Sequence, residues 1–294
     1  MTKIKKAVIA AAGRGTRFLP VVKSYAKELV PVLAKPNIQL LVEELIGAGI
    51  SEICIVHRNG ETGIKNYFTP DADLEKYLKN NNKTSFLDSL REIWDKVKIM
   101  EFISQPLDLP YGNASPALAA ESFIGKDPFV YLFGDDLIIE PKPGQFLTEM
   151  LATYDKFHPD AVMATQQVPW EEIVRYGCIK YKNNPKHPNQ VETVVEKMPP
   201  DDAPSNNAVL GRFVVSNKIL ENIKKQAISR DNELWWADAI NELAQTGVVL
   251  NQTIKHGEWM TTGDPLRWLK ANIAIALQEP RYSADLKEFM QKIT

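Results

Sequence analysis

The stretch that decides the fold reads Ala7-Val8-Ile9-Ala10-Ala11-Ala12-Gly13-Arg14-Gly15-Thr16-Arg17. It begins as a short apolar run, which is typical of a strand covered on both faces of a sheet. It continues as a loop with two glycines and two arginines. Glycine lets backbone N–H groups approach a ligand closely, and arginine offers a fork of donors that matches phosphate oxygens. The stretch therefore predicts a phosphate-binding loop, and the alternative is a tight turn with solvated arginines.

This loop differs from two common nucleotide-binding motifs. The dinucleotide motif G-x-G-x-x-G requires glycine where this chain has Phe18, and no G-x-x-x-x-G-K-[ST] string occurs. Neither a dinucleotide-binding loop of that kind nor a P-loop is expected.

Composition narrows the class of protein further. The chain has 294 residues, of which 44% are hydrophobic, and its formal net charge is −2, so we expect no nucleic-acid partner. We expect no membrane association, because no apolar run approaches the roughly 20 residues that span a bilayer. The apolar core at the N-terminus is too short for an export signal. Cys54 and Cys178 are interpreted as reduced core residues, which favours a cytoplasmic protein.

Strand-like and helix-like segments alternate along the first half of the chain, as in a parallel sheet with helices on both faces. The pattern becomes more mixed after Gly134. The expected strands are 4–10, 52–57, 99–103, 129–133, 161–166, 178–181, 191–196 and 210–215. The expected helices are 36–48, 74–97 with an interruption at 80–82, 115–123, 219–227, 236–245 and 265–277. This order predicts a Rossmann-like α/β fold with a mixed, mainly parallel central sheet, in one domain over 1–294.

Three further stretches carry charged groups. Asp135 and Asp136 follow the strand 129–133, where paired carboxylates suit Mg²⁺, although either could instead cap a turn. Lys23 and Lys27 either converge on a polyphosphate or form a solvated face. Glu196-Lys197 ends the strand 191–196, and it either recognises a sugar phosphate or is a surface ion pair of small energy.

Together these stretches resemble the bacterial-type UTP–glucose-1-phosphate uridylyltransferases, within the sugar-phosphate nucleotidyltransferase family. The resemblance covers nearly the whole chain, and the order of the motifs is more specific than any one of them. The motifs are Ala11 to Pro20, Lys27 to Pro31, Lys35-Pro36, Gln39, Val42 to Glu44, Gln105, Gly112 to Ala114, Leu132 to Asp136, Tyr176-Gly177, Val195 to Lys197, Ala203 to Asn206, Gly211 to Phe213, Glu233, Ala237 to Ile240 and Leu269 to Ala271.

The resemblance implies a function and a set of site residues. It implies a nucleotide-diphospho-sugar transferase type of fold, in which 1–140 binds the nucleotide and 141–294 binds the sugar. The implied reaction transfers a uridylyl group from UTP to glucose 1-phosphate, with Mg²⁺ as cofactor and a homo-oligomer, dimer or tetramer, as the assembly. The implied residues are Arg17, Lys27 and Asp135 for catalysis, Ala11, Ala12, Gly13, Gly15, Gln105 and Gly112 for the nucleotide, Gly177, Glu196, Lys197, Gly211 and Glu233 for the sugar phosphate, and Asp135 for the metal, with Asp136 and Asp264 as further candidates.

The chain departs from the family pattern at a few positions. Thr261 stands where the family carries a second metal-binding aspartate. Three outcomes are open: Asp264 replaces that aspartate as a metal ligand, Asp135 with substrate oxygens and water is enough to bind the metal, or catalysis is impaired. Asp231-Asn232 replaces a pair of glycines. Trp235-Trp236 replaces a smaller pair, either as a platform for the sugar or as core packing. Two alternative functions follow: the same reaction with another base or sugar, and a non-catalytic paralogue that binds a nucleotide sugar and regulates an active partner.

Overall fold

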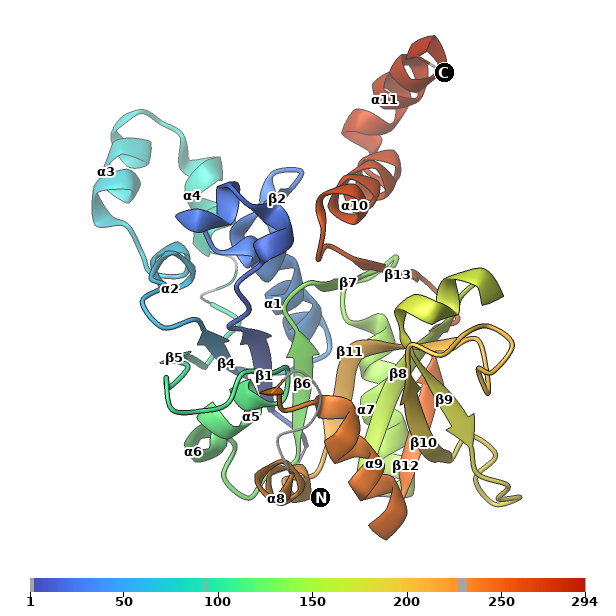
Figure 1. The fold of residues 1–294 in the computed structure, drawn as a ribbon. Helices are drawn as coiled ribbons and strands as arrows, with labels where there is room; N and C mark the ends of the chain where they lie inside the picture. The colour runs from blue at the N-terminus through green and yellow to red at the C-terminus, as the bar shows by residue number, and fades with distance from the viewer. Residues whose placement is uncertain (1–2, 92, 94, 227–231, 294) are drawn as a thin grey trace.

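The computed structural model describes residues 3–91, 93, 95–226 and 232–293 (Figure 1). Within these residues the largest sheet has nine strands, seven of them in the order β10-β9-β11-β6-β1-β4-β5, while β8 pairs with β11 and β12. The strands of this sheet are β1 (Lys6–Ala11), β4 (Glu52–His57), β5 (Ile99–Ser104), β6 (Phe129–Phe133), β8 (Ala161–Gln167), β9 (Gly177–Tyr181), β10 (Val191–Glu196), β11 (Asn207–Val215) and β12 (Val249–Thr253).

The first half of the chain forms the parallel part of the sheet. Strand β1 lies between β4 and β6 and is parallel to both, and β5 is parallel to β4. The register places Ala10 beside both Val56 and Phe133. The loops that follow β1 and β6 therefore leave the sheet at the same edge, which is where open α/β sheets bind ligands.

The second half completes the same sheet with mostly antiparallel strands, although β12 is parallel to β8. Strand β11 is antiparallel to β6, β8 and β9, and β10 is antiparallel to β9. Two small pairs lie outside the main sheet: β2 (Pro31–Val32) with β3 (Lys35–Pro36), and β7 (Asp136–Ile139) with β13 (Glu258–Thr261). The expected mixed α/β sheet is confirmed, and residues of both halves build it.

Helices cover both faces of the sheet, as the side chains of β1 show. Ala7 and Ile9 belong to one core cluster, which α1 and α7 complete. Val8 belongs to the other, which α5, α8 and α9 complete. The helices are α1 (Asn37–Gly47), α2 (Gly63–Tyr67), α3 (Ala72–Asn80), α4 (Thr84–Arg91), α5 (Ser115–Ala119), α6 (Glu121–Ile124), α7 (Gln145–Phe157), α8 (Lys218–Lys225), α9 (Trp236–Thr246), α10 (Pro265–Gln278) and α11 (Pro280–Ile293).

The structure differs from the expected helices in two respects. The helix expected at 115–123 is divided at Ala120 into α5 and α6. The sequence analysis assigned no element to α7, whose buried Phe146, Leu147 and Met150 have helical spacing. The interruption expected at 80–82 is confirmed between α3 and α4. Residues 92, 94 and 227, which fall within expected helices, lie outside the described residues.

Other expectations concern the cysteines and the ends of the fold. Cys54 and Cys178 are free and buried, as predicted. None of the helices in the described part of the chain is both long and apolar enough to cross a membrane. Helix α11 packs on α10 but has no buried residue, and it extends away from the sheet (Figure 1).

Candidate active site

The loop after β1 and the loop after β6 meet because their strands are neighbours. The N–H of Gly134 donates to the carbonyl of Ala10 over 3.0 Å. The short helix η3 (Lys27–Leu29) then brings Lys27 to the same place, and its Nζ lies 2.6 Å from Oδ2 of Asp135. Lys27 therefore lies with Asp135 beside the loop after β1. Lys23 lies elsewhere, exposed on the wall of a different cavity.

The two loop glycines have different surroundings. Gly15 has a φ of +62°, and a Cβ there would meet the Lys27 side chain at 3.1 Å, so its free face is filled by that lysine. Gly13 lies 3.5 Å, measured from its ideal Cβ position, from Lys27 Nζ. Gly13 therefore lies closer to the charged end of Lys27, whereas Gly15 packs on its aliphatic part.

Lys27 and Asp135 stabilise each other's charged forms. Burial alone would lower the pKa of Lys27, but the carboxylates of Asp135 and Glu28 outweigh it and raise that pKa. Burial alone would raise the pKa of Asp135, but Lys27 and Arg17 outweigh it and lower that pKa. A cation and an anion are thus present side by side at neutral pH.

One cavity, of about 310 Å³, opens over this pair, and we call it the loop cavity. Buried Oε1 of Gln105 has no hydrogen-bond partner in the described part of the chain, so it is free to accept from a ligand. Ala11, in β1, is buried and does not line this cavity. The cavity is lined by Ala10, Ala12, Gly13, Arg17, Lys27, Gln105, Tyr111, Gly112, Asn113, Pro116, Phe133, Asp135, Glu233 and Trp235.

A second cavity, of about 300 Å³, opens at the ends of β9 and β10, and we call it the inner cavity. The register places Glu196 opposite Gly177, and a Cβ on Gly177 would lie 2.7 Å from Glu196 Oε1. Lys197 follows with a φ of +53°. The inner cavity is lined by Arg17, Asn113, Phe133, Asp135, Asp136, Met163, Arg175, Tyr176, Gly177, Val194, Glu196, Lys197, Val209, Phe213, Trp235, Trp236, Ala237, Ile240, Trp259, Thr261 and Arg267.

The two cavities form one cleft. Arg17, Asn113, Phe133, Asp135 and Trp235 line both of them. The charged pair of Lys27 and Asp135 therefore lies near the boundary at which ligands in the two cavities would meet. Asn113 belongs to the motif Gly112 to Ala114, but sequence reasoning gave it no role of its own.

Two predicted sugar-binding residues lie elsewhere than expected. A Cβ on Gly211 would lie 2.4 Å from Cβ of Phe133 and 2.5 Å from its ring, so the close packing of Phe133 requires glycine here, and Gly211 does not line the inner cavity. Glu233 lines the loop cavity with Gln105. Only Gly177, Glu196 and Lys197 of the five lie around the inner cavity.

Asp136 and Asp264, the further metal candidates, are engaged in the fold. Oδ2 of Asp136 accepts the N–H of Gly211 over 2.8 Å, and burial together with Asp135 raises the pKa of Asp136 to about 6. Asp264 is the N-cap of α10, where it accepts the N–H of Arg267 and pairs with the guanidinium of that residue. Of the three aspartates, Asp135 alone lies on the wall of both the loop cavity and the inner cavity.

Thr261 lies beside Asp135, as the sequence comparison implied. The pairing of β7 and β13 places Thr261 opposite Asp136, and its Oγ1 is 3.3 Å from the Asp135 carbonyl. The N–H of Thr262 also donates to that carbonyl. One carboxylate and one hydroxyl at the edge of a cleft are hard oxygen donors, and they fit Mg²⁺ when substrate phosphates and water supply the other ligands.

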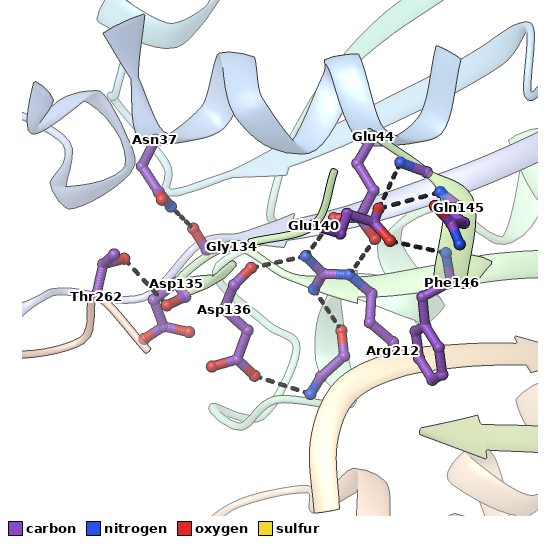
Figure 2. A network of polar contacts seen from close by, with 12 residues as sticks. Asn37, Glu44, Gly134, Asp135, Asp136, Glu140, Gln145, Phe146, Arg212 and Thr262 are labelled. Carbon is purple, nitrogen blue, oxygen red and sulfur yellow. Dashed lines mark hydrogen bonds and ion pairs between the residues drawn. The ribbon is translucent and has the colours of Figure 1, made fainter. Parts of the chain in front are cut away.

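A buried arginine fixes this segment, and the sequence analysis gave it no role. The Arg212 guanidinium binds both carboxylate oxygens of Glu44 over 2.7 Å and the Asp136 carbonyl over 2.7 Å (Figure 2). Its side chain is fully buried. The signal that could have found it is a single arginine within an apolar strand, because a buried charge needs a partner.

Comparisons with known proteins show which family the chain resembles in sequence and in fold. The profile of the nucleotidyl transferase family matches residues 6–278. A UTP–glucose-1-phosphate uridylyltransferase of Streptococcus pneumoniae serotype 4 is 37% identical, over 98% of this chain and 96% of that protein. The UTP-bound UGPase of Acinetobacter baumannii superposes with a TM-score of 0.88 at 31% identity, over 99% of this chain and all of that one.

A further solved structure is a UDP-glucose pyrophosphorylase in complex with UDP-glucose. It has a TM-score of 0.82 and 30% identity, and the match covers 94% of this chain and all of that one. The chain therefore belongs to the nucleotidyl transferase family, in the group that contains the UTP–glucose-1-phosphate uridylyltransferases.

Proposed function

We propose that the chain transfers a uridylyl group from UTP to glucose 1-phosphate, giving UDP-glucose and pyrophosphate. The observation that carries the proposal is the cleft itself, in which two cavities meet at a boundary bordered by Arg17 and Asp135. The names of the relatives point to the same reaction. A cleft of this kind suits a reaction that joins two anionic substrates.

The chemical step needs little proton transfer. An oxygen of the sugar phosphate forms a bond to the α-phosphorus of UTP, and the bond from that phosphorus to the pyrophosphate oxygen breaks. The attacking oxygen is already anionic near neutral pH, so repulsion between the two anions is the main barrier. Fixed positive groups lower such a barrier because they are oriented before the reaction begins.

We assign the nucleotide to the loop cavity. Backbone groups of Ala12 and Gly13 would contact its phosphates, and Gln105 Oε1 would accept from the base. Arg17 and Lys27 would stabilise the departing pyrophosphate. In this assignment Ala11 and Gly15 support the loop: Ala11 is buried in β1, and Gly15 packs on the aliphatic part of Lys27.

We assign the sugar phosphate to the inner cavity. Glu196 would accept from sugar hydroxyls, while Gly177 leaves room for that carboxylate. Lys197 would bind the phosphate. Glu233, which lines the loop cavity, would contact the substrates from the nucleotide side. In this assignment 1–140 supplies most of the nucleotide side and 141–294 most of the sugar side, within a single domain, and Glu233 is an exception.

Asp135 is the residue that would hold Mg²⁺, with Thr261 as the nearest additional oxygen donor. The metal would neutralise charge on the phosphates when bound. Lys27 pairs with Asp135 over 2.6 Å and keeps that carboxylate ionised, ready to bind a cation. Asp136 and Asp264 would keep their hydrogen bonds to the backbone N–H groups of Gly211 and Arg267.

The test is pyrophosphate release with a panel of nucleoside triphosphates and sugar 1-phosphates. We expect UTP with glucose 1-phosphate to give the highest kcat/KM, and chelation of divalent cations to abolish it. Faster turnover of another pair would change the assigned substrates and keep the reaction. Binding of UDP-glucose without turnover of any pair would favour the regulatory paralogue.

The proposal includes the expected homo-oligomer and cytoplasmic location. Helix α11 supports the oligomer, since Phe289 and Ile293 are more than half exposed on a helix that buries no residue. A dimer or tetramer would cover these side chains. Light scattering of the purified chain, with and without residues 280–294, measures this directly.

A further inference from the structure

Two adjacent tryptophans have different surroundings. The Trp236 side chain is 1% exposed and stacks on Tyr131 with ring centroids 4.0 Å apart, so it is a core residue. Trp235 is only partly buried, and it lines both the loop cavity and the inner cavity. Core packing therefore explains Trp236 and leaves Trp235 to be explained.

The backbone at Trp235 is fixed by the loop that lines the nucleotide side. The N–H of Leu234 donates to the Tyr111 carbonyl over 2.8 Å. The N–H of Trp236 donates to Oδ1 of Asn113 over 2.7 Å. The residue between them, Trp235, is thus held at the boundary of the cavities from both sides. A large ring on a fixed backbone can select the shape of a ligand without losing much entropy.

The surroundings of Trp235 match the chemistry of a pyranose ring. Such a ring carries hydroxyls around its edge and C–H groups on its faces. The inner cavity offers a carboxylate and an ammonium at Glu196 and Lys197, and it offers the aromatic surface of Trp235 at its boundary with the loop cavity. A binding site with a few polar groups and an aromatic wall is typical of small polar ligands.

We propose that the Trp235 indole is the wall against which the pyranose ring of the sugar 1-phosphate packs, and that it determines which sugars are accepted. This inference rests on the proposed function, since it names a specificity-determining residue for that reaction. Trp235 contacts the sugar and takes no part in the transfer of charge. Its removal should therefore weaken sugar binding more than nucleotide binding.

The experiment compares W235A and W235F with the unmodified protein. KM is measured for glucose 1-phosphate and for UTP, and titration calorimetry measures the affinities for UDP and UDP-glucose. W235A should raise the KM for glucose 1-phosphate about tenfold, which is about 1.4 kcal/mol, and should leave the KM for UTP within about twofold. W235F keeps an aromatic face and should stay within about threefold of the unmodified protein.

The affinity ratio of UDP-glucose to UDP separates a sugar contact from a merely structural role. In W235A this ratio should fall about tenfold, whereas damage to the 232–236 segment would weaken both ligands equally. Equal weakening, or no change in either, would overturn the inference. The matched control is W170A, because Trp170 is an exposed tryptophan outside both cavities.

The inference and the proposed function fail in different ways. If the unmodified protein neither binds UDP-glucose nor releases pyrophosphate, the proposed function is wrong. If the unmodified protein is active and W235A binds and turns over glucose 1-phosphate normally, only the inference is wrong. A change of preference among sugar 1-phosphates in W235A, with glucose losing most, would support it.

Discussion

The two walls of the cleft hold their charged groups differently. On the loop wall, formed by the loop after β1, η3 and the end of β6, Lys27 and Asp135 are paired over 2.6 Å, and the lysine side chain is 15% exposed. On the strand-end wall, formed by the ends of β9 and β10, Lys197 is exposed and has no ion-pair partner among the residues that the structure describes. The charged groups of the loop wall are thus held in place before substrates bind. On the strand-end wall, Lys197 would gain a partner only when a substrate binds.

This difference assigns different parts of the kinetics to the two walls. Groups that are already oriented stabilise the transition state without reorganisation, so changes on the loop wall should lower kcat. An exposed lysine loses side-chain freedom only when it binds, so changes on the strand-end wall should raise KM. The predictions below test this division.

The largest effect is expected for K27M on the loop wall. Removing the ammonium leaves the partly buried Asp135 carboxylate without its hydrogen-bonded cation. We expect kcat to fall by a factor on the order of 10³, with a much smaller change in the KM for glucose 1-phosphate. Steady-state pyrophosphate release measures both.

The matched control for K27M is K23M, since Lys23 is an exposed lysine on the same segment but in a different cavity. K23M should keep its kcat within about twofold, as is usual for an exposed charge away from the chemistry. A loss of less than tenfold in K27M would contradict the assignment of the chemical step to the loop wall.

The next largest effect is expected for R212M, which removes the buried guanidinium that binds Glu44 and the Asp136 carbonyl behind the loop wall. It would leave the Glu44 carboxylate buried without its cation, so we expect a loss of about 3 kcal/mol in the free energy of unfolding. Urea denaturation measures this. The double variant R212M/E44L removes the unpaired charge and should regain at least about 1 kcal/mol. A single variant as stable as the unmodified protein would show that the network does not hold Asp135 in place.

The sequence predicted the loop wall better than the support behind it. Lys27 and Asp135 were found because each lies in a short motif next to a predicted strand. The roles of Asp136 and Gly211 were not found, because they depend on a hydrogen bond between residues 75 positions apart. The position of Glu233 in the loop cavity depends on its bridge to Tyr111. This too is a contact between residues far apart in the sequence, and no local pattern encodes it.

The same limit applies to the fold. Parallel strands were predicted well, since runs buried on both faces are visible in the sequence. Helix α7 was missed, although its buried residues have helical spacing, and the split at Ala120 left no clear local mark. The pairing of β7 with β13, which brings Thr261 to Asp135, is a long-range contact that no local pattern encodes.

A third prediction tests the electrostatics within the loop wall by the change E28Q. Glu28 is buried, and its Oε1 takes part in no hydrogen bond among the described residues, although it lies 3.9 Å from Lys27 Nζ. Burial raises its pKa to about 8, although Lys27 opposes the shift. A raised carboxyl pKa means that the folded state binds a proton more tightly than the unfolded state. The stability that protonated Glu28 contributes is therefore fully present below about pH 4.5, and it is lost as the pH rises through 8.

E28Q removes this titration, because its amide stays neutral. Relative to the unmodified protein, E28Q should gain stability between pH 5 and pH 8.5, on the order of 2 kcal/mol. Urea denaturation of the substrate-free protein at both values measures the gain. An equal difference at the two pH values would show that Glu28 does not titrate with a raised pKa.

On the strand-end wall, K197A should change binding more than turnover. We expect the KM for glucose 1-phosphate to rise about tenfold and kcat to change less than about threefold, because an exposed cation is screened and contributes a modest binding energy. K186A is the matched control, since Lys186 is an exposed lysine in the loop between β9 and β10. A fall in kcat as large as in K27M would remove the distinction between the walls.

The smallest effect is expected at Thr261, which lines the inner cavity and whose Oγ1 lies 3.3 Å from the Asp135 carbonyl. T261D would add a second carboxylate beside Asp135, so the Mg²⁺ concentration for half-maximal activity should fall about threefold, while UTP affinity stays within about twofold. T261N has the same shape without the charge and should leave the Mg²⁺ requirement unchanged. If T261D changes the Mg²⁺ requirement and the UTP affinity equally, Thr261 does not face the metal. Asp135 would then be the one protein carboxylate that the proposed magnesium site requires.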